Sequence, residues 1–570
     1  MERSDEHDYA TTLLSNETVA MRNEFLIGSF LVVAFIGGLS YLWPSAAWAY
    51  AFVGPIVVLG LYDVLQRKHT LLRNFPILGH GRYLMEAIRP EIQQYFVERD
   101  TDSNPISREK RAIVYQRAKG VLDTHPFGTQ RDVYEPGYEW VCHSLEASMP
   151  EEFEGRIEVG GPQCSQPYHS SPLNISAMSY GALSKTAVQA LNKGAARGGF
   201  SHNTGEGGVS PFHLEYGGDL VWQIGTGYFG CRTLDGEFDP GLYSEMAGRE
   251  EVKMVELKLS QGAKPGHGGI LPAEKVTEEI AEIRHVPAGE DVISPPTHKE
   301  FSTPIGLLEF VQQLRELSGG KPVGFKLCVG RPLEIMGICK AIRQTEIYPD
   351  FITVDGKEGG TGAGPLEFVN SVGLPLRDGL TLVDNALRGA DIRDSIRLFA
   401  SSKIITGFDI FRAMALGADA CNSARAMMLA LGCIQARRCN SNHCPTGVAT
   451  QKKELYDGID VPDKGERVWR YHKETLEGFM ELLGAAGLED PETIQPEHVM
   501  QRIDETKISS LAEIYPGVYK GALLEGEAPQ SYQKAWDRSS VQRFCPQSNL
   551  PEKRSQSSSS KETTAVAEPT

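Results

Sequence analysis

The pattern of apolar and polar residues divides the chain into a short, strongly apolar N-terminal segment and a much longer mixed region. Residues 25–62 contain no charged residue. This run is long enough for two membrane crossings and too long for one. The pattern therefore predicts two transmembrane helices at residues 25–43 and 46–65, with a turn at Pro44 and Ser45 between them.

The charges beside this apolar segment indicate its orientation. Arg67, Lys68 and Arg73 follow the second predicted helix directly, and basic residues mark the cytoplasmic side of a membrane helix. A hairpin then returns the leader, residues 1–24, to the cytoplasm as well. The alternative is a signal peptide cleaved after the AWA sequence at residues 47–49. The acid-rich leader and the second apolar segment favour the hairpin.

Short apolar runs alternate with helical patterns from about residue 173 onward. The runs lie in LNISAMSYGALS, SHNTGEGG, LVWQIGTGYFG, MVELKLSQGAKPGHGG, VISPPTH, PVGFKLCVG, FITVDGKEGGTGAGP, IRLFASSKIITG and DACNSARAMM. Strands that alternate with crossover helices predict a parallel sheet. About eight such units predict an α/β fold, a (β/α)8 TIM-type barrel, with its site at the carboxyl ends of the strands. The alternative is a doubly wound sheet, which no dinucleotide-binding fingerprint supports.

The same patterns predict how the chain is divided. We interpret residues 66–160, which mix helical and irregular stretches, as a collar between membrane and barrel rather than a loose linker. The barrel is predicted at residues 161–480 and a helical extension at residues 481–540. Residues 541–570 are polar and of low complexity, which predicts a disordered tail.

Composition excludes one class of partner. The formal net charge is −17 at pH 7, and no basic stripe interrupts the acidic sequence. Nucleic-acid-binding surfaces are basic, so the sequence argues against a nucleic acid partner.

Cysteines cluster in the segment GCIQARRCNSNHCPTGVATQ, residues 432–451. The segment holds three of the chain's ten cysteines: Cys433, Cys439 and Cys444. A disulfide would leave one thiol over, and zinc with His443 as fourth ligand lacks the paired C-x2-C spacing. An iron–sulfur cluster suits soft thiolate ligands, two nearby arginines and a Cys-Pro ending. Three ligands favour a three-iron cluster unless Cys421 is a fourth; buried, inert cysteines are the remaining alternative.

Small and basic residues mark the loops after the predicted strands. Two consecutive strands end in small residues that a phosphate group can approach: Ser401, Ser402, Ser423 and Ala424. Lys326 lies among apolar strand residues and therefore either meets an electron-rich partner, such as the pyrimidine edge of a flavin, or reaches water at the strand end. The glycine loop GKEGGTGAG, residues 356–364, allows a ligand to approach the backbone and is not a P-loop.

Several of these motifs together resemble one family. HNTGEGG, QGAKPGHGGILP, ISPPTH, FKL, GGTGAGP and the cysteine segment resemble the flavin-binding synthase domain of glutamate synthase, over residues 173–451. The resemblance implies an FMN-binding barrel with a 3Fe-4S cluster held by Cys433, Cys439 and Cys444. It implies that Glu206 and Lys326 are catalytic and that Lys264 and Arg284 bind the oxo-acid. The cofactor-binding residues that it implies, besides Lys326, are Ser176, Ala177, Met178, Ser179, Gln223, Gly359, Gly360, Ser401, Ser402, Ser423, Ala424 and Arg425.

The sequence also departs from the full-length members of that family. The glutaminase domain and the C-terminal glycine-repeat domain have no counterpart in the sequence. Ile270 stands where those members place a glutamine, His267 where they place an acidic residue, and Ser401 with Ser402 where they place a glycine pair. The resemblance therefore supports the predicted fold and flavin more strongly than it supports the predicted substrate.

Three functions follow from this resemblance and its departures. The first is reductive amination of 2-oxoglutarate to glutamate, with ammonia or an amine as nitrogen source. Ferredoxin or a membrane redox partner would supply electrons, and a separate amidotransferase subunit would supply ammonia. The second is a related flavin oxidoreductase acting on another amino acid or a methylated amine. The third is a membrane-bound electron-transfer subunit with no small-molecule substrate, which the retained Glu206, Lys264 and Arg284 oppose.

Overall fold

The structure is a computed structural model, which describes residues 21–100, 104–121, 124, 126–148 and 155–545. Most of the predicted leader (1–24) and most of the predicted tail (541–570) lie outside these residues. The chain divides into two compact units, Met1–Ser103 and Asn104–Thr570. This division falls inside the range that the sequence assigns to a collar.

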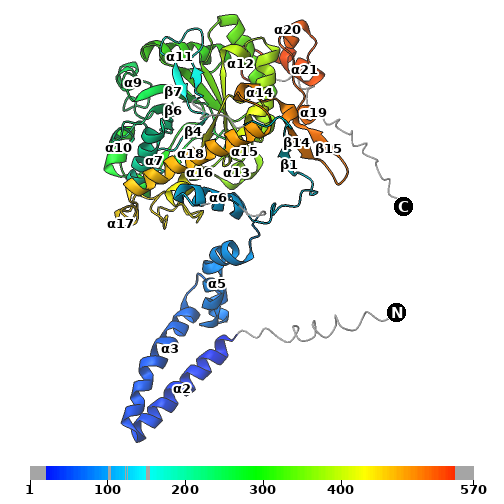
Figure 1. Cartoon of the computed structure of the whole chain (residues 1–570). Helices are drawn as coiled ribbons and strands as arrows, with labels where there is room; N and C mark the ends of the chain where they lie inside the picture. Colours follow the sequence, from blue (N-terminus) through cyan, green and yellow to red (C-terminus); the bar gives the residue numbers. More distant parts are fainter. Residues whose placement is uncertain (1–20, 101–103, 122–123, 125, 149–154, 546–570) are drawn as a thin grey trace, which may run out of the picture. The chain divides into compact units, whose positions relative to one another are not determined.

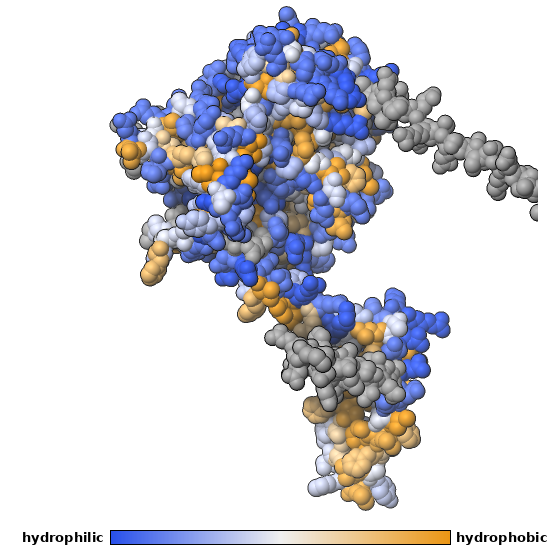
Figure 2. Space-filling view, turned by 90° about the vertical axis from the view of Figure 1, so that its right-hand side faces the viewer, coloured by the Kyte–Doolittle hydropathy of each residue, from blue (hydrophilic) through white to orange (hydrophobic). Residues whose placement is uncertain are grey.

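The first unit begins with two apolar helices, α2 (Arg22–Leu42) and α3 (Tyr50–Leu65), joined by the 3-10 helix η1 (Pro44–Ala49). By length and composition both are able to cross a membrane, as segments Arg22–Leu42 and Pro44–Leu65. Their large apolar side chains face outward; Phe30 is 73% exposed and Phe35 70%. Figure 2 shows these apolar side chains gathered over the hairpin. An apolar surface of this extent indicates contact with lipid or with another protein.

Short helices complete this unit: α4 (Thr70–Asn74), α5 (Leu78–Ile92) and the π-helical turn η2 (Gln93–Val97). The carboxylate of Asp63, fully buried near the end of α3, accepts hydrogen bonds from the Ile77 amide at 2.9 Å and pairs with His80 Nε2 at 2.9 Å. This contact joins α5 to α3. The apolar side chains of Leu84, Ile88 and Ile92 recur at helical spacing in α5 and are exposed.

A closed barrel of eight parallel strands forms the centre of the second unit (Figure 1). The strands are β4 (Leu173–Ile175), β5 (His202–Asn203), β6 (Leu220–Ile224), β7 (Val252–Lys258), β10 (Val323–Leu327), β11 (Phe351–Asp355), β12 (Arg397–Ser401) and β13 (Ala420–Ser423). The β13–β4 pairing closes the ring. The TIM-type barrel predicted from the alternating pattern is confirmed.

Helices between the strands cover the barrel: α7 (Lys185–Gly198), α9 (Pro240–Ala247), α11 (Pro304–Leu317), α12 (Pro332–Thr345), α14 (Leu376–Gly389), α15 (Gly407–Ala415) and α16 (Arg425–Leu431). Several of these helices begin after a serine or threonine N-cap, whose hydroxyl accepts a hydrogen bond from a backbone amide in the first turn. Examples are Ser184, Thr303 and Thr406. The short helices α8 (Pro211–Leu214), α13 (Leu366–Ser371) and α17 (Lys453–Tyr456) lie in the loops. The main apolar core lies between strands and helices.

One predicted strand lies outside the barrel. The apolar start of VISPPTH forms β9 (Val292–Ile293), which pairs antiparallel with β8 (Ile270–Leu271). Helix α10 (Glu278–Arg284) lies between these two strands. The segment β8–α10–β9 is therefore an insertion in the loop after β7, and the next barrel strand is β10. We call the whole loop between β7 and β10 the excursion after β7.

Elements from both ends of the second unit pack around the barrel. Helix α18 (Val461–Ala485) packs against α7, α15 and α6 (Arg108–Lys119). The predicted helical extension contains α19 (Leu511–Ile514), α20 (Ala522–Glu525) and α21 (Gln530–Arg538). It also contains strands β14 (Val499–Arg502) and β15 (Ile508–Ser510), which form a sheet with β1 (Glu139–Val141). A separate antiparallel pair, β2 (Ile157–Val159) and β3 (Tyr168–Ser170), precedes the barrel.

Candidate active site

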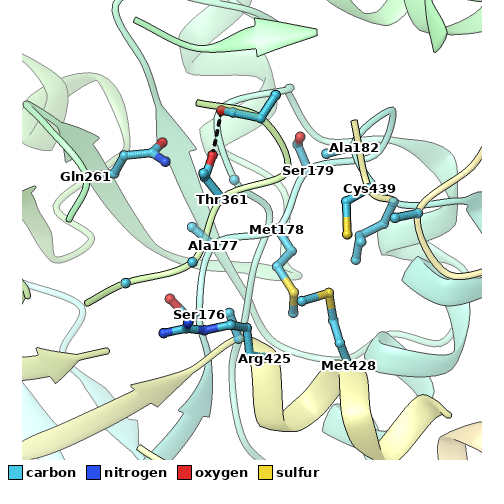
Figure 3. A pocket seen from close by; sticks show the side chains of 18 of the residues that line it. Ser176, Ala177, Met178, Ser179, Ala182, Gln261, Thr361, Arg425, Met428 and Cys439 are labelled. Atoms are coloured by element: carbon cyan, nitrogen blue, oxygen red, sulfur yellow. Dashed lines mark hydrogen bonds between the residues drawn. The ribbon is translucent and has the colours of Figure 1, made fainter. Parts of the chain in front are cut away.

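A cavity of about 740 Å³ opens at the carboxyl ends of the barrel strands. Every residue that the sequence assigns to catalysis, substrate, cofactor or metal lines it, from Ser176 after β4 to Cys444 in the cysteine segment. Figure 3 shows part of this lining, with the side chains of Met178 and Met428 directed toward one another. The structure therefore brings together residues that are up to 268 positions apart in sequence (Ser176 and Cys444).

The lining is strongly basic. Eight basic side chains face two acidic ones, Glu206 and Asp355; the basic residues are Lys258, Lys264, Arg284, Lys326, Lys403, Arg425, Arg437 and Arg438. The chain as a whole carries a net charge of −17. Four of these basic residues are buried (Lys258, Lys264, Arg284 and Lys326), whereas Arg437 and Arg438 are exposed. Buried cations in excess of buried anions favour the binding of anionic ligands.

Glu206 is held as an anion by a lysine that the sequence analysis did not select. Lys258 Nζ donates to Glu206 Oε1 at 2.7 Å and to Gln261 Oε1 at 2.7 Å. Burial alone would raise the pKa of Glu206, but Lys258, Arg284 and Lys264 outweigh it and lower the pKa. The carboxylate is therefore ionised and fixed toward the cavity near neutral pH. Lys258 lies in VELKL, an apolar strand interrupted by lysine, as Lys326 does in VGFKL.

Lys326 lies beside Lys258 on the neighbouring strand, since the two residues are paired in the β10–β7 register. Lys326 is only 5% exposed. Within the part of the chain that the structure describes, no side chain or carbonyl accepts a hydrogen bond from its ammonium group. A buried ammonium without an anion is costly, so this side chain is suited to a ligand that carries or gains negative charge. The ammonium lies at the cavity, where either a ligand or water is able to reach it.

Lys264 and Arg284 supply two further cations from the excursion after β7. Burial, with a contribution from Lys258, lowers the pKa of Lys264 to about 8. Burial lowers the pKa of Arg284 to about 10, against the opposing effect of Glu206. Arg284 Nη2 donates to the Tyr180 carbonyl at 2.9 Å and to Ser179 Oγ at 3.3 Å, while its buried Nε has no partner among the described residues. The unpaired Nε–H remains available to an acceptor.

Small residues crowd the opposite wall of the cavity. Ser402 Oγ donates to Asp355 Oδ1 at 2.9 Å, and Ser423 Oγ donates to the Ile404 carbonyl at 2.6 Å. A Cβ on Gly359 would lie 3.0 Å from Ser402 Oγ, and one on Gly360 would lie 3.0 Å from Arg425 Cδ. These serine hydroxyls are therefore used within the protein. A phosphate group here would meet mainly backbone amides, the Ser176–Ser401 hydroxyl pair (3.3 Å apart) and Arg425.

The carboxylate of Glu256 orients the side-chain amide of Gln223. Its Nε2 donates to Glu256 Oε1 at 2.6 Å. Asn203 Nδ2 donates to the same oxygen at 2.8 Å, and Thr353 Oγ1 donates to Oε2 at 2.6 Å. Because the Gln223 amide nitrogen is engaged by a carboxylate, its carbonyl oxygen is the group left for a ligand in the cavity.

The cysteine segment forms an irregular loop along one side of the cavity. Gln435, Arg437 and Asn442 adopt positive φ values of 58°, 54° and 56°, and strained backbone of this kind concentrates at functional sites. Tyr115 Oη donates to the Cys433 carbonyl at 2.6 Å, which ties the loop to α6. Among the described residues, no three His, Cys, Asp or Glu side chains converge as metal ligands. Cys433, Cys439 and Cys444 all line the cavity, and their thiols are soft donors.

The two other candidate ligands lie elsewhere. Cys421 is completely buried in β13, and burial raises the pKa of its thiol. His443 is exposed, with Nε2 2.6 Å from Lys452 Nζ. Neither belongs to the cavity lining that the structure describes, which disfavours both a fourth thiolate from Cys421 and a zinc site that includes His443.

Comparisons with known proteins agree with these features. Residues 146–489 match the family model described as a conserved region in glutamate synthase. The glutamate synthase large subunit-like protein YerD of Bacillus subtilis (strain 168) is 36% identical over 521 residues, covering 84% of this chain and 97% of that protein. The archaeal glutamate synthase [NADPH] of Methanocaldococcus jannaschii is 36% identical over 332 residues. That match covers 57% of this chain and 61% of the archaeal protein, so this chain spans less than two thirds of it.

Matches to solved structures are distant. A flavocytochrome b2 mutant with pyruvate bound has a TM-score of 0.38 at 12% identity, covering 78% of this chain and 91% of that chain. Mandelate oxidase with (S)-2-phenylpropionate has a TM-score of 0.36 at 14% identity, covering 72% and 98%.

Proposed function

The chain belongs to the glutamate synthase family and is an oxidoreductase, and from this premise we propose that it uses FMN to convert 2-oxoglutarate and ammonia into glutamate. The observation that carries the proposal is the charge of the cavity, where eight basic residues face two acidic ones in an acidic chain. A flavin phosphate, a reduced flavin and a dicarboxylate are the anions that such a cavity suits.

The cofactor residues divide between the two ends of an FMN molecule. Ser176, Ser401 and Arg425, together with the backbone around Gly359 and Gly360, would hold the phosphate. Lys326 would bind the pyrimidine edge and stabilise its negative charge on reduction. The other lining residues of the predicted set, Ala177, Met178, Ser179, Gln223, Ser402, Ser423 and Ala424, would shape the pocket. When bound, FMN supplies the hydride that reduces the imine formed from the oxo-acid and ammonia.

The substrate would lie between the flavin and the excursion after β7. Lys264 and the free Nε–H of Arg284 would bind its two carboxylates. Glu206, kept ionised by Lys258, would accept a proton from the ammonium ion or the attacking amine. The carbonyl oxygen would leave as water when the imine forms, and Glu206 would return its proton to the imine nitrogen when the carbon is reduced.

Electrons would enter through the cysteine segment. We place a 3Fe-4S cluster on Cys433, Cys439 and Cys444, because three soft ligands line the same cavity as the flavin residues. Ferredoxin or a membrane redox partner would supply the electrons, and a separate amidotransferase subunit is a candidate source of ammonia. The support for these partners is the chemistry of the proposed reaction, which consumes reducing equivalents and ammonia.

A membrane anchor is proposed for the first unit. Its support is the pair of apolar helices with outward-facing side chains and the basic residues Arg67, Lys68 and Arg73 after α3. These features favour a two-helix anchor in the cell membrane, with the catalytic unit in the cytoplasm. Deletion of residues 1–65 should release the protein from membranes with its flavin retained.

Ile270 favours a second candidate, a related oxidoreductase for another amino acid or a methylated amine. Ile270 lies on β8, and its half-buried apolar side chain lines the cavity. The full-length members of the family that this chain resembles have a glutamine at this position. An apolar group at that point suits a less polar acceptor.

Anaerobic stopped-flow measurements test the proposal. The protein is reduced and mixed with 2-oxoglutarate plus ammonia, with glutamine, or with other oxo-acids plus ammonia or methylamine. Fast flavin reoxidation by 2-oxoglutarate plus ammonia supports glutamate synthesis, and a preference for another pair supports the second candidate. If no acceptor reoxidises the flavin, the remaining hypothesis is an electron-transfer subunit. Cys439→Ser should remove the iron and leave the FMN, so iron that persists in this variant, or zinc in its place, contradicts the cluster assignment.

A further inference from the structure

A further buried lysine, Lys275, contacts the cysteine segment and has no role in the proposed reaction. Lys275 is 2% exposed. Its Nζ donates to the carbonyl of Cys439 at 2.7 Å, to that of Ala449 at 2.8 Å and to that of Ala182 at 3.2 Å. One ammonium group therefore joins the cysteine segment to the loop after β4.

A neighbouring contact strengthens the same junction. Asn442 Nδ2 donates to the Glu274 carbonyl at 2.9 Å. Gln451 Nε2 donates to the Gly181 carbonyl at 3.0 Å and to the Leu183 carbonyl at 2.8 Å. The second half of the cysteine segment, from Cys439 to Gln451, is thus held at several points, and Lys275 is the one charged side chain among these donors.

The ammonium of Lys275 lacks a carboxylate partner. No Asp or Glu in the described part of the chain forms an ion pair with it; its three acceptors are neutral carbonyls. The shortest of these contacts is to the carbonyl of Cys439, so the buried ammonium lies against the cysteine segment itself. A buried cation with only neutral acceptors is stabilised by negative charge close to it, which an anionic group on the cysteines would supply.

We propose that Lys275 is a positioning residue that fixes the cysteine segment and provides the positive charge for an anionic iron–sulfur cluster on Cys433, Cys439 and Cys444. This inference rests on the proposed function, because it needs the cluster. A fixed positive charge stabilises the more negative, reduced form of the cluster, so it raises the reduction potential. Reduction by the electron donor is then easier.

The chain contains a matched control. Lys321, before β10, also donates to three backbone carbonyls, those of Ala247, Arg249 and Val252, each at 2.7 Å. It is 9% exposed and does not line the cavity that holds the cysteines. Substitution of either lysine removes the same kind of contact, but only one change removes a charge beside the cysteines.

The experiment compares Lys275→Met, Lys275→Arg and Lys321→Met with the full wild-type chain. Iron and FMN contents, melting temperature and the cluster potential, from an EPR-monitored redox titration, are measured for each. Lys275→Met should lower the equilibrium constant for cluster reduction about tenfold, which is about 59 mV for a one-electron couple. Lys275→Arg and Lys321→Met should keep the wild-type potential.

A second supporting result is loss of iron in Lys275→Met with FMN and melting temperature retained, while Lys321→Met keeps its iron. Wild-type iron content and potential in Lys275→Met overturn the inference. Equal loss of iron and stability in both methionine variants also overturns it, because Lys275 would then be only a backbone support. Absence of iron from the wild-type chain overturns the cluster assignment and this inference together. The two overturning results above are different, because there the wild type holds iron and only the role of Lys275 fails.

Discussion

Buried charged groups are paired within the protein at the amino end of the barrel, whereas some at the carboxyl end keep donors without partners in the described part of the chain. At the amino end, Asp350 accepts hydrogen bonds from Arg315 Nε and Nη2 at 3.1 and 3.0 Å and from the Val323 amide at 2.7 Å. Its other oxygen accepts from the Gly161 amide at 2.6 Å. At the carboxyl end, the buried Arg284 Nε has no partner among the described residues. The ammonium of Lys326, a residue only 5% exposed, forms no hydrogen bond within the same described residues. One end is internally satisfied and the other is left for ligands.

The apolar packing shows the same contrast. A small core from β2, β3 and the barrel interior fills the amino end with Val159, Tyr168, Met254, Phe351 and Phe399. The carboxyl end keeps a cavity of about 740 Å³. Charges that are paired inside the protein serve stability, whereas buried charges left unpaired around a cavity indicate binding. Variants at the two ends should therefore affect different properties.

The largest effect on stability is expected at the amino end. Asp350→Ala should lower the free energy of unfolding by about 3–5 kcal/mol, because it leaves the buried Arg315 guanidinium unpaired. Glu477→Ala, which breaks an exposed pair with Lys473, should change it by less than about 1 kcal/mol. Denaturant unfolding of the second unit measures both. Similar values for the two variants would remove the distinction between the ends.

Lys326→Met should have the reverse effect. Removing an unpaired buried cation should leave the melting temperature of the ligand-free protein unchanged or raise it. Turnover should fall by about 10²–10³-fold, the effect of removing one donor to a developing anion. The control is Lys321→Met, which should leave turnover unchanged. A variant that is destabilised but fully active would assign Lys326 to the fold rather than to the flavin.

Ile270→Gln sharpens the substrate assignment. A hydrogen bond to a charged group is worth about 1.5–3 kcal/mol, or roughly one to two powers of ten in affinity. If 2-oxoglutarate is the substrate, it should bind weakly to the wild type and more tightly to the variant. If the acceptor is less polar, the variant should turn it over more slowly. Tight 2-oxoglutarate binding that the change does not affect contradicts this role for Ile270.

The smallest effect concerns pH. The lowered pKa of Lys264, about 8 in the ligand-free protein, means that its ammonium is charged below pH 8 and loses its proton above it. Affinity for the oxo-acid should therefore be constant below pH 8. It should fall toward tenfold per pH unit above it. Lys264→Arg should remove the decline, since guanidinium stays charged. A decline that persists in this variant would assign the titration to another group.

Sequence patterns predicted the barrel well because its strands are short, apolar and followed by glycine or serine, as at β10 and β11. The cavity lining followed from motifs, although the roles of its residues remain predictions. Lys258 was missed even though VELKL has the pattern that identified Lys326. Lys275 carried no local signal, since its burial depends on loops more than 90 residues away, at Ala182 and Ala449. The pairing of β1 with β14 was missed because the two strands are more than 350 residues apart.

The central claim is that this cavity converts an oxo-acid and ammonia into an amino acid. A single-turnover reaction tests it most directly: fully reduced protein is mixed anaerobically with 2-oxoglutarate and ¹⁵N-labelled ammonium, and the products are analysed by mass spectrometry. The account predicts ¹⁵N-glutamate in an amount limited by the reducing equivalents on the protein, with reoxidation of the flavin at the same rate. Flavin that stays reduced, or that is reoxidised without labelled glutamate, would contradict the account.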